Sequence, residues 1–311
     1  MKPIESGSDD PFAGFGPQPV RCRWLSESDE KRFPSAKVVR LVVDDQRWSG
    51  EGSNAIYQRH AIREISEFLG PTKATIVTPA GMITINTGIN RDDSESIGSH
   101  LTEYEEVVAG LDFGPAQPEI LLGLDGYQAA CGLVFQSVVH LHAEPRLVRF
   151  ANAALKLYPT GVERGILRTW KQIESQEALT DDYAIGRIAK TVAGRFLTFV
   201  CNDACLFSAR SNANLTEPTA LLVRAHLESA LSEGLTPDFV LLATHFHEST
   251  RSGGVFKDAA KRIAADCETT VATTFFARRE QLDDLAESFA TQGERSEEVV
   301  TLVVEDTLGQ N

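Results

Sequence analysis

The chain lacks long hydrophobic runs, an excess of positive charge and a glycine-rich phosphate loop. No apolar run approaches the roughly 18 to 20 residues that span a bilayer, and the N-terminus, MKPIESGSDDPFAGFGPQP, lacks the apolar core of a signal peptide, so we expect a cytoplasmic protein with no membrane partner. With 44 acidic and 30 basic residues the formal net charge is −14, which disfavours nucleic acid as a partner. The segments SGGVF and GLDGYQAACG fit neither common phosphate-loop spacing, so we expect no nucleotide cofactor.

Cysteine is also sparse. The five cysteines are an odd number and widely scattered, which argues for reduced thiols and against a disulfide framework. Cys201 and Cys205 form one isolated C-x-x-x-C without a second pair, so zinc is not expected. His245 and His247 share one face of a predicted strand but lack a third ligand, so we expect them to contact substrate or solvent, and we expect no metal.

Apolar, β-branched runs alternate with amphipathic segments, which is typical of an α/β domain. Strands are expected at 37–45, 73–81, 119–126, 195–201, 238–244, 270–277 and 297–306, with two or three antiparallel strands within 128–157. Helices are expected at 53–70, 101–111, 182–194, 218–234 and 253–268. Residues 1–36 are rich in Gly, Pro, Ser and Asp, so we expect a flexible or surface-wrapped arm before a single domain over 37–311.

Cys201 occupies a position suited to chemistry. It follows the apolar run 195–200 and enters a turn, and open α/β sheets gather their ligand sites at such strand ends. The alternative is a structural role, because free cysteine commonly packs as a small hydrophobic residue. A thiol with the ordinary pKa of about 8.5 is only slightly ionised at neutral pH, so a nucleophilic cysteine needs a neighbouring base or cation.

Several segments resemble the nitrilase, or carbon-nitrogen hydrolase, superfamily. GRFLTFVCND resembles the family's strand and elbow around its nucleophilic cysteine, and ALKLYPTGVERG (154–165) resembles its lysine segment. The order of similar segments is kept over residues 37–277, while the C-terminal segment of about 278–311 diverges. The resemblance implies an α-β-β-α sandwich of mixed sheets with helices on the outer faces, and a homodimer. Residues 166–194 are longer than the family pattern, so we expect a lid or an oligomer contact there.

The resemblance also implies roles for particular residues. Cys201 would be the nucleophile, Lys156 would stabilise the oxyanion, and Glu163 would support the lysine. The family's general-base glutamate belongs just after Pro79, where this chain has Ala80.

Other carboxylates could take the place of the missing glutamate, and each proposed role also has a purely structural alternative. Asp125 ends its predicted strand on the favourable side and Glu163 is a second option, whereas Glu119 precedes the strand and belongs at the opposite edge. Without the resemblance, Lys156 would be read as a solvated strand-end lysine and Glu163 as half of a surface ion pair with Arg164.

Two functions remain open at this stage. One is a cysteine-dependent amidase or nitrilase that acts on a small amide, nitrile or carbamoyl compound through a thioester at Cys201. The other is a catalytically inactive relative that binds a ligand or serves as an assembly module. In either case the candidate pocket residues besides the predicted catalytic ones are Asn202, Asp203, His245, His247, Ala80 and Asp125. Asp203 also suits a turn.

Overall fold

The computed structural model describes residues 20–44, 55–86, 118–128, 132–141, 148–156, 187–211, 221, 225, 236–246 and 250–307. Their strands form one mixed, mostly parallel sheet with helices on its outer faces, so the expected α/β class is confirmed. The strands are β1 (Val20–Trp24), β2 (Val38–Asp44), β3 (Thr75–Val77), β4 (Ile83–Asn86), β5 (Ile120–Gln128), β6 (Gly132–Leu141), β7 (Val148–Leu155), β8 (Ile188–Thr191), β9 (Gly194–Val200), β10 (Phe239–Phe246), β11 (Thr270–Ala277) and β12 (Val299–Asp306). The main helices are α1 (Glu27–Arg32), α2 (Ala55–Leu69), α8 (Thr250–Asp266) and α9 (Leu282–Ser288).

The sheet divides at β2. One edge of β2 pairs in parallel with β12 along Val38–Val43. Its other edge pairs with β3 over Val38–Arg40 and with β11 over Val42–Asp44. Two branches leave β2 in this way, a first branch β3-β5-β6-β7 and a second branch β11-β10-β9-β8. β2 is buried along its whole length, as its nearly continuous apolar sequence predicts for a parallel strand covered on both faces.

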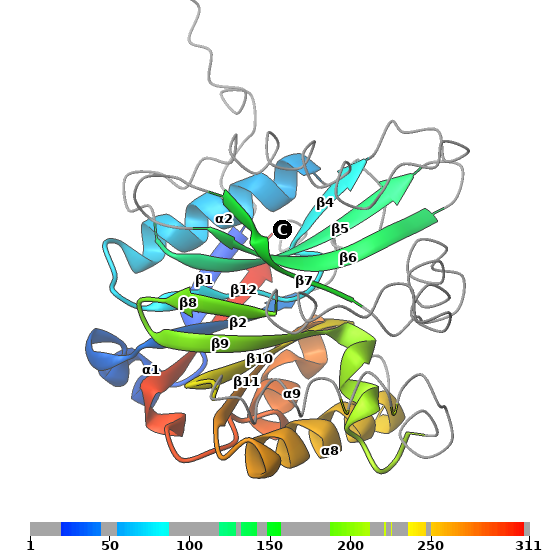
Figure 1. The fold of residues 1–311 in the computed structure, drawn as a ribbon. Helices are drawn as coiled ribbons and strands as arrows, with labels where there is room; N and C mark the ends of the chain where they lie inside the picture. The colour runs from blue at the N-terminus through cyan, green and yellow to red at the C-terminus, as the bar shows by residue number, and fades with distance from the viewer. Residues whose placement is uncertain are drawn as a thin grey trace, which may run out of the picture.

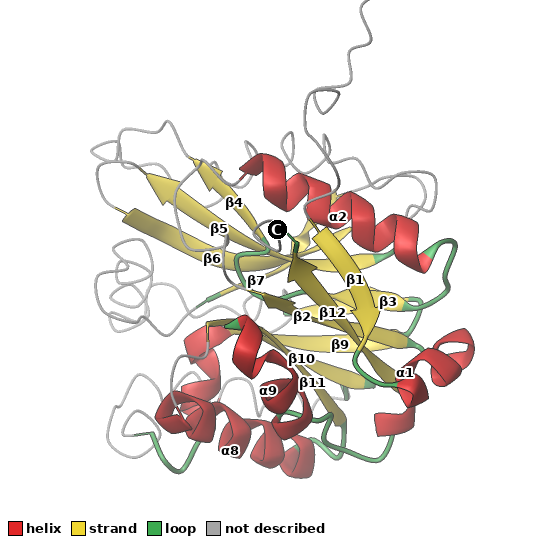
Figure 2. Cartoon of the chain, turned by 180° about the vertical axis from the view of Figure 1, so that it is seen from behind, coloured by secondary structure: helices red, strands yellow, loops and turns green. Residues whose placement is uncertain are grey.

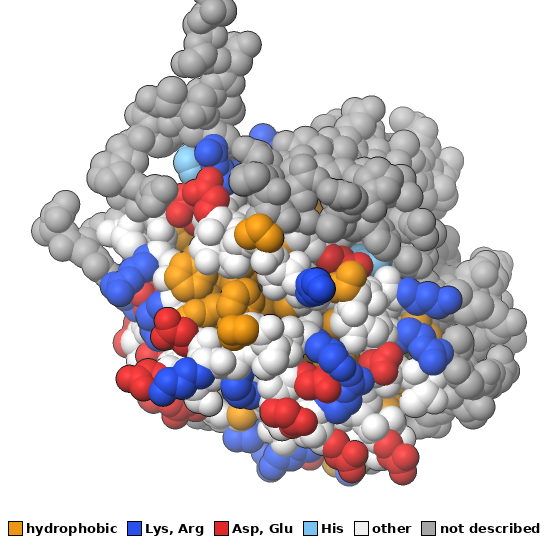
Figure 3. All heavy atoms as spheres, turned by 90° about the vertical axis from the view of Figure 1, so that its left-hand side faces the viewer, with side chains coloured by type: hydrophobic (Ala, Val, Ile, Leu, Met, Phe, Trp, Pro, Cys, Tyr) orange, Lys and Arg blue, Asp and Glu red, His pale blue; other side chains and the backbone are white. Residues whose placement is uncertain are grey.

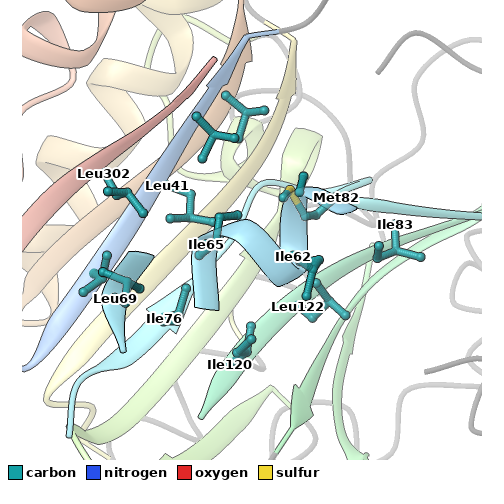
Figure 4. Close-up of a cluster of buried hydrophobic side chains, with 14 of the residues drawn as sticks. Leu41, Ile62, Ile65, Leu69, Ile76, Met82, Ile83, Ile120, Leu122 and Leu302 are labelled. Atoms are coloured by element: carbon teal, nitrogen blue, oxygen red, sulfur yellow. The ribbon is translucent and has the colours of Figure 1, made fainter. Parts of the chain in front are cut away.

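Helix α2 covers the outer face of the first branch. Its apolar residues Ile62, Ile65 and Leu69 recur at helical spacing and lie over the sheet (Figure 4). The residues beneath them include the strand residues Leu41, Ile76, Ile83, Ile120, Leu122 and Leu302, together with Met82 just before β4. Burial of such side chains contributes about 1.5–3 kcal/mol each, so the amphipathic pattern of 53–70 is sufficient to explain both the helix and its position.

Helices α8 and α9 cover the outer face of the second branch, on the side of the molecule opposite α2 (Figure 1). Phe256, Ala260 and Ile263 of α8 pack with Leu242 of β10 and Phe275 of β11. β1 and β12 run side by side, as seen from behind in Figure 2.

A third apolar cluster draws on both branches and has no helix residues. The first branch supplies Val77, Leu121, Val138 and Ala154, and the second supplies Ala189, Phe196, Val200, Phe239, Leu241, Ala243 and Ala272. The inner faces of the two branches therefore pack against each other, and we call this region the inner layer.

Residues 20–36, predicted as part of an arm, have places in the fold. β1 pairs antiparallel with β12, and Ser26 caps α1 by accepting a hydrogen bond from the Asp29 backbone N–H at 3.1 Å. The ring of Trp24 in β1 packs at a tilt against the ring of Phe33 and against that of the half-exposed Phe68 in α2. Hydrophobic side chains gather on this side of the molecule (Figure 3). β1 has only 5 residues, so its alternation of apolar and polar side chains is too short to indicate a strand within a segment rich in Gly, Pro and Ser. Residues 1–19 lie outside the described residues.

The helix predicted over 182–194 is wrong in its described part. Residues 188–191 form β8, which pairs antiparallel with β9 through a turn at 192–193. Apolar residues at 185, 188 and 192 match helical spacing, but Gly194 adopts φ +131, which ends any helix and sets up the hairpin. The helix predicted at 101–111 and nearly all of that at 218–234 lie outside the described residues. Among the described helices, none is long and apolar enough to cross a membrane.

Glu119 joins the two branches at one end of the inner layer. Its carboxylate accepts hydrogen bonds from Thr75 Oγ1 at 3.1 Å and from the Val192 backbone N–H at 2.6 Å, and it lies 2.9 Å from His140 Nε2. Val192 belongs to the β8–β9 turn, so one buried carboxylate bridges the first branch and the second. His140 is fully buried.

We expect Glu119→Gln to destabilise the fold in a pH-dependent way. Burial opposes ionisation of Glu119, but the hydrogen bonds from His140 and Val192 outweigh burial and lower its pKa. A lowered folded-state pKa contributes stability that is present above the ordinary pKa of about 4.3 and is lost as the pH falls through the folded-state value. Glu119→Gln should therefore cost about 1–3 kcal/mol at pH 7 and less at pH 3.5 in urea unfolding.

The matched control is Glu27→Gln, because the side chain of Glu27 is 89% exposed. This control should leave unfolding unchanged at both pH values. An unchanged midpoint for Glu119→Gln at pH 7, or a cost that persists at pH 3.5, would contradict the assignment.

Candidate functional site

Cys201 follows β9 directly and begins a short 3-10 helix, η3 (Cys201–Leu206). Its backbone adopts φ +47, which is uncommon outside glycine and costs of the order of 1–3 kcal/mol. Such strain persists where the surroundings hold it, and it concentrates at functional sites. Cys201 is partly exposed and borders apolar clusters on both faces of the second branch. The strand-to-elbow geometry predicted for this residue is present.

A chain of polar side chains crosses the inner layer near that elbow. Lys156, just after β7, donates from Nζ to Gln136 Oε1 at 2.7 Å, and Gln136 Nε2 donates to Asp125 Oδ1 at 3.0 Å. The other Asp125 oxygen, Oδ2, lies 2.6 Å from His245 Nε2. We call these four residues the polar chain. It begins on the first branch and ends on the second.

Strand periodicity explains why these side chains meet. Residues two apart on a strand point to the same side. Asp125 continues the inner row of Leu121 on β5, and His245 continues the row of Leu241 and Ala243 on β10. Gln136 and Lys156 extend the inner rows of β6 and β7 in the same way. The inner layer is thus apolar in its middle and polar at this end.

Lys156 and Cys201 lie at the same end of the inner layer. Both act electrostatically on the thiol of Cys205, whose pKa is raised to about 12: burial is the largest cause, Cys201 and Asp203 also raise it, and Lys156 lowers it. Lys156 is buried, so its ammonium is stabilised by partners such as Gln136 and not by bulk water. Lys156 and Cys201 are therefore both close enough to Cys205 to influence its ionisation.

Ala80 is fully buried in the inner layer, and its neighbourhood is filled by other groups. Gly123 packs against the Pro79 carbonyl, and a Cβ there would lie 2.7 Å from Ala80 Cα. At Gly81, with φ +75, a Cβ would collide with His245 Nε2 and lie 2.7 Å from Asp125 Oδ2. The Asp125–His245 pair therefore borders the position at which the resembling family has its glutamate.

Asn202 and Asp203 bond within the elbow. The Asn202 side-chain oxygen accepts from Cys205 Sγ at 2.9 Å. The Asp203 carboxylate accepts from the Val200 backbone N–H at 3.4 Å and pairs with buried Arg187 at 3.1 Å. Asp203 thus has the turn-forming role predicted for it.

Sequence reasoning missed Arg187 and Gln136. Arg187 lies in a segment read as helical, and Gln136 is a single amide in an apolar strand, so neither carried a signal. Glu163 and His247, two of the predicted site residues, lie outside the described residues. Within the described part of the chain, no group of three His, Cys, Asp or Glu could hold a metal ion.

The thiols are expected to differ sharply in reactivity. Burial raises the pKa of Cys205 to about 12 and, with Glu64 and Glu305, that of Cys22 to about 12. Because the thiolate is the reactive form, iodoacetamide at pH 8 should modify both at least about a hundredfold more slowly than an ordinary thiol with a pKa of about 8.5. Peptide mapping over time, with N-acetylcysteine as the reference thiol, measures these rates. Labelling of Cys205 at the reference rate would contradict the buried assignment.

No protein-family model matches the chain, and the search of curated proteins found no match. What the site does is therefore inferred from its own geometry.

Proposed function

We propose that the chain is a cysteine-dependent hydrolase of carbon-nitrogen bonds that acts on a small amide, nitrile or carbamoyl compound. The observation that carries this proposal is the meeting of a buried lysine and an aspartate–histidine pair at the end of the inner layer where Cys201 takes φ +47. Acyl transfer needs a cation, a base and a nucleophilic thiol at one place, and these groups lie at one end of the inner layer.

For an amide, the chemistry proceeds in two steps. The Cys201 thiolate attacks the substrate carbonyl carbon, and the Lys156 ammonium stabilises the oxyanion that develops. Collapse of the tetrahedral intermediate breaks the C–N bond, releases ammonia or an amine, and leaves a thioester on Cys201. Water then attacks the thioester, a carboxylic acid leaves, and the thiol is restored. A neighbouring base removes a proton from the thiol first and from the water second.

The layered architecture supports the same proposal. The two branches face each other, α2 covers one outer face, and α8 and α9 cover the other. We propose that this arrangement is the α-β-β-α sandwich that the resembling segments imply. Cys201 and Lys156 would then occupy the positions of that family's cysteine and lysine.

Ala80 favours a second candidate function, which is ligand binding without turnover. General acid–base help contributes about 10²- to 10⁴-fold to such reactions, and the position expected to supply it has only a methyl group. The same end of the inner layer would then hold a small amide or acid, with Lys156 as its anion-binding group.

Incubation with a panel of simple amides, nitriles and carbamoyl compounds separates the two candidates. Hydrolysis predicts ammonia release and an acyl adduct that intact-mass and peptide analysis place on Cys201. Both signals should vanish in Cys201→Ala and persist in the matched variant Cys267→Ala. Thermal stabilisation by a compound without adduct or ammonia would instead favour the binding function.

A further inference from the structure

We propose that the Asp125–His245 pair is the general base that activates Cys201, in place of the carboxylate missing at position 80. His245 receives the thiol proton, and Asp125 positions the imidazole and stabilises its charged form. The proposal rests on the proposed role of Cys201 as nucleophile.

The sheet register places His245 beside the elbow. β9 and β10 are parallel neighbours, and Val200 stands opposite Ala243. Cys201 comes directly after Val200, and His245 comes two residues after Ala243, on strands whose axes lie about 4.8 Å apart. Both residues therefore emerge at the carboxyl ends of adjacent strands, where ligand sites of parallel sheets gather.

The hydrogen bond to Asp125 prepares the imidazole for proton transfer. A 2.6 Å contact between Asp125 Oδ2 and His245 Nε2 holds the proton on Nε2 and makes Nδ1 the basic nitrogen. Asp125 is 1% exposed, and its other oxygen accepts from Gln136, so the carboxylate is fixed in one orientation. The edge of the Phe276 ring, with its centroid 6.0 Å from the imidazole, restrains the ring further.

Gly81 provides the space that the pair occupies. Any larger residue there would press its Cβ on His245 and Asp125, and φ +75 itself favours glycine. The imidazole thus reaches the inner layer beside Ala80, at the location that the resemblance gives to the glutamate. The His245 side chain is 33% exposed, so water can reach part of the imidazole ring.

The proton balance is complete with these groups. The Cys201 thiol proton moves to His245 Nδ1, and the sulfur forms its bond to the substrate carbon. The imidazolium, paired with the Asp125 carboxylate, then donates that proton to the leaving nitrogen as the C–N bond breaks. In the second half of the cycle the same nitrogen takes a proton from water and returns it to the sulfur.

A purely structural bridge between the branches is the competing explanation, and the molecule contains a matched control for it. Glu119 and His140 form a second carboxylate–imidazole pair, 2.9 Å apart, at the opposite end of the inner layer. This pair also helps to join the branches, through the Val192 N–H, but in the register of β5 and β6 it lies several residues away from Asp125 and Gln136.

The test is the rate at which iodoacetamide alkylates Cys201 at pH 7, followed by peptide mapping. A thiol of pKa about 8.5 is about 3% ionised at pH 7, so loss of an efficient base should slow alkylation by about 10- to 30-fold. We expect that loss in His245→Ala and in His245→Gln. Asp125→Asn should give a smaller loss, and His140→Gln should give none.

Chemical rescue separates a base from a bridge. Added imidazole can enter the partly exposed space left in His245→Ala and should restore most of the lost rate. It should not accelerate the wild-type protein or His140→Gln. His245→Gln keeps a donor for Asp125, so a melting temperature close to wild type in that variant excludes a general loss of structure.

The outcomes distinguish this inference from the proposed function, because alkylation needs no substrate. If Cys201 is alkylated at the wild-type rate in both His245 variants, or if imidazole fails to restore a lowered rate, the base assignment is overturned. Ammonia release that depends on Cys201 but is unchanged in His245→Gln also overturns it and leaves the hydrolase function intact. Labelling that depends on His245, with no ammonia from any compound, supports the base and contradicts the hydrolase.

Discussion

Replacing Arg40 with methionine is expected to lower the free energy of unfolding by about 3–5 kcal/mol. Arg40 lies on β2, where the sheet divides, and is 2% exposed. Its guanidinium donates to Thr301 Oγ1 at 2.7 Å and to the carbonyls of Thr273 at 3.1 Å, Phe289 at 2.5 Å and Ala286 at 2.8 Å. One side chain thereby ties β2 to β11, β12 and the C-terminal end of α9.

Methionine approximates the length of the arginine stem but donates no hydrogen bond, so these buried acceptors would lose a partner in a site without water to replace it. Burial lowers the pKa of Arg40 to about 10 while Asp29 opposes the shift, so Arg40 is charged at pH 7 and its loss removes charge-assisted bonds. Urea unfolding at pH 7 measures the effect. Arg262→Met is the control, because that side chain is 43% exposed and pairs with Asp258 only at 3.8 Å. A cost for Arg40→Met below about 1 kcal/mol, as for an ordinary surface change, would show that the network does not hold β2, β11, β12 and α9 together.

Lys156→Met is expected to slow the acylation of Cys201 by a small amide about 10²- to 10³-fold, while the loss of its buried hydrogen bond to Gln136 lowers the free energy of unfolding by only about 1–3 kcal/mol. In the proposed reaction, the buried ammonium stabilises a charge that develops only in the transition state. Methionine removes the cost of burying a charge but leaves Gln136 Oε1 without the donor that Lys156 supplies, so some loss of stability is expected in any case. A loss of rate much larger than the loss of stability is therefore the signature of a functional lysine.

The measurement is the rate of acyl-adduct formation on Cys201 with one amide from the panel, alongside a thermal melt. Lys190→Met on β8 is the control, because Lys190 is exposed. The opposite pattern, with acylation preserved and the melting temperature several degrees lower, would identify Lys156 as a structural residue and remove it from the site.

Much of the fold follows from short patterns in the sequence. Strands such as β2 and β11 are buried on both faces, so continuous runs of Val, Phe and Thr identify them without knowledge of their neighbours. Helix α2 is identified by one apolar stripe and by Gly70 after its end, where φ +62 suits only glycine well. β8 was missed because four residues of a hairpin carry too little periodicity to outweigh a helical spacing around them.

The candidate site could be predicted only in part. Cys201 was singled out because it ends an apolar strand, Lys156 only because its segment resembles that of a known family, and Asp125 because it lies at the far end of its predicted strand. Asp125 and His245 are 120 residues apart in sequence and meet only because the two branches pack together, so no local pattern encodes their contact. Gln136, which links Lys156 to Asp125, is an amide that sequence alone does not distinguish from any polar strand residue.

The place of β12 has a consequence for how the protein is made. β12 lies between β1 and β2, although about 260 residues separate it from β2 in sequence. During synthesis, β1 and one edge of β2 have no strand to pair with until residues 299–306 have left the ribosome. Shortening the chain before Val299 would therefore remove the strand that joins β1 to β2 and leave two unpaired strand edges, which are the templates for aggregation in an unfinished protein.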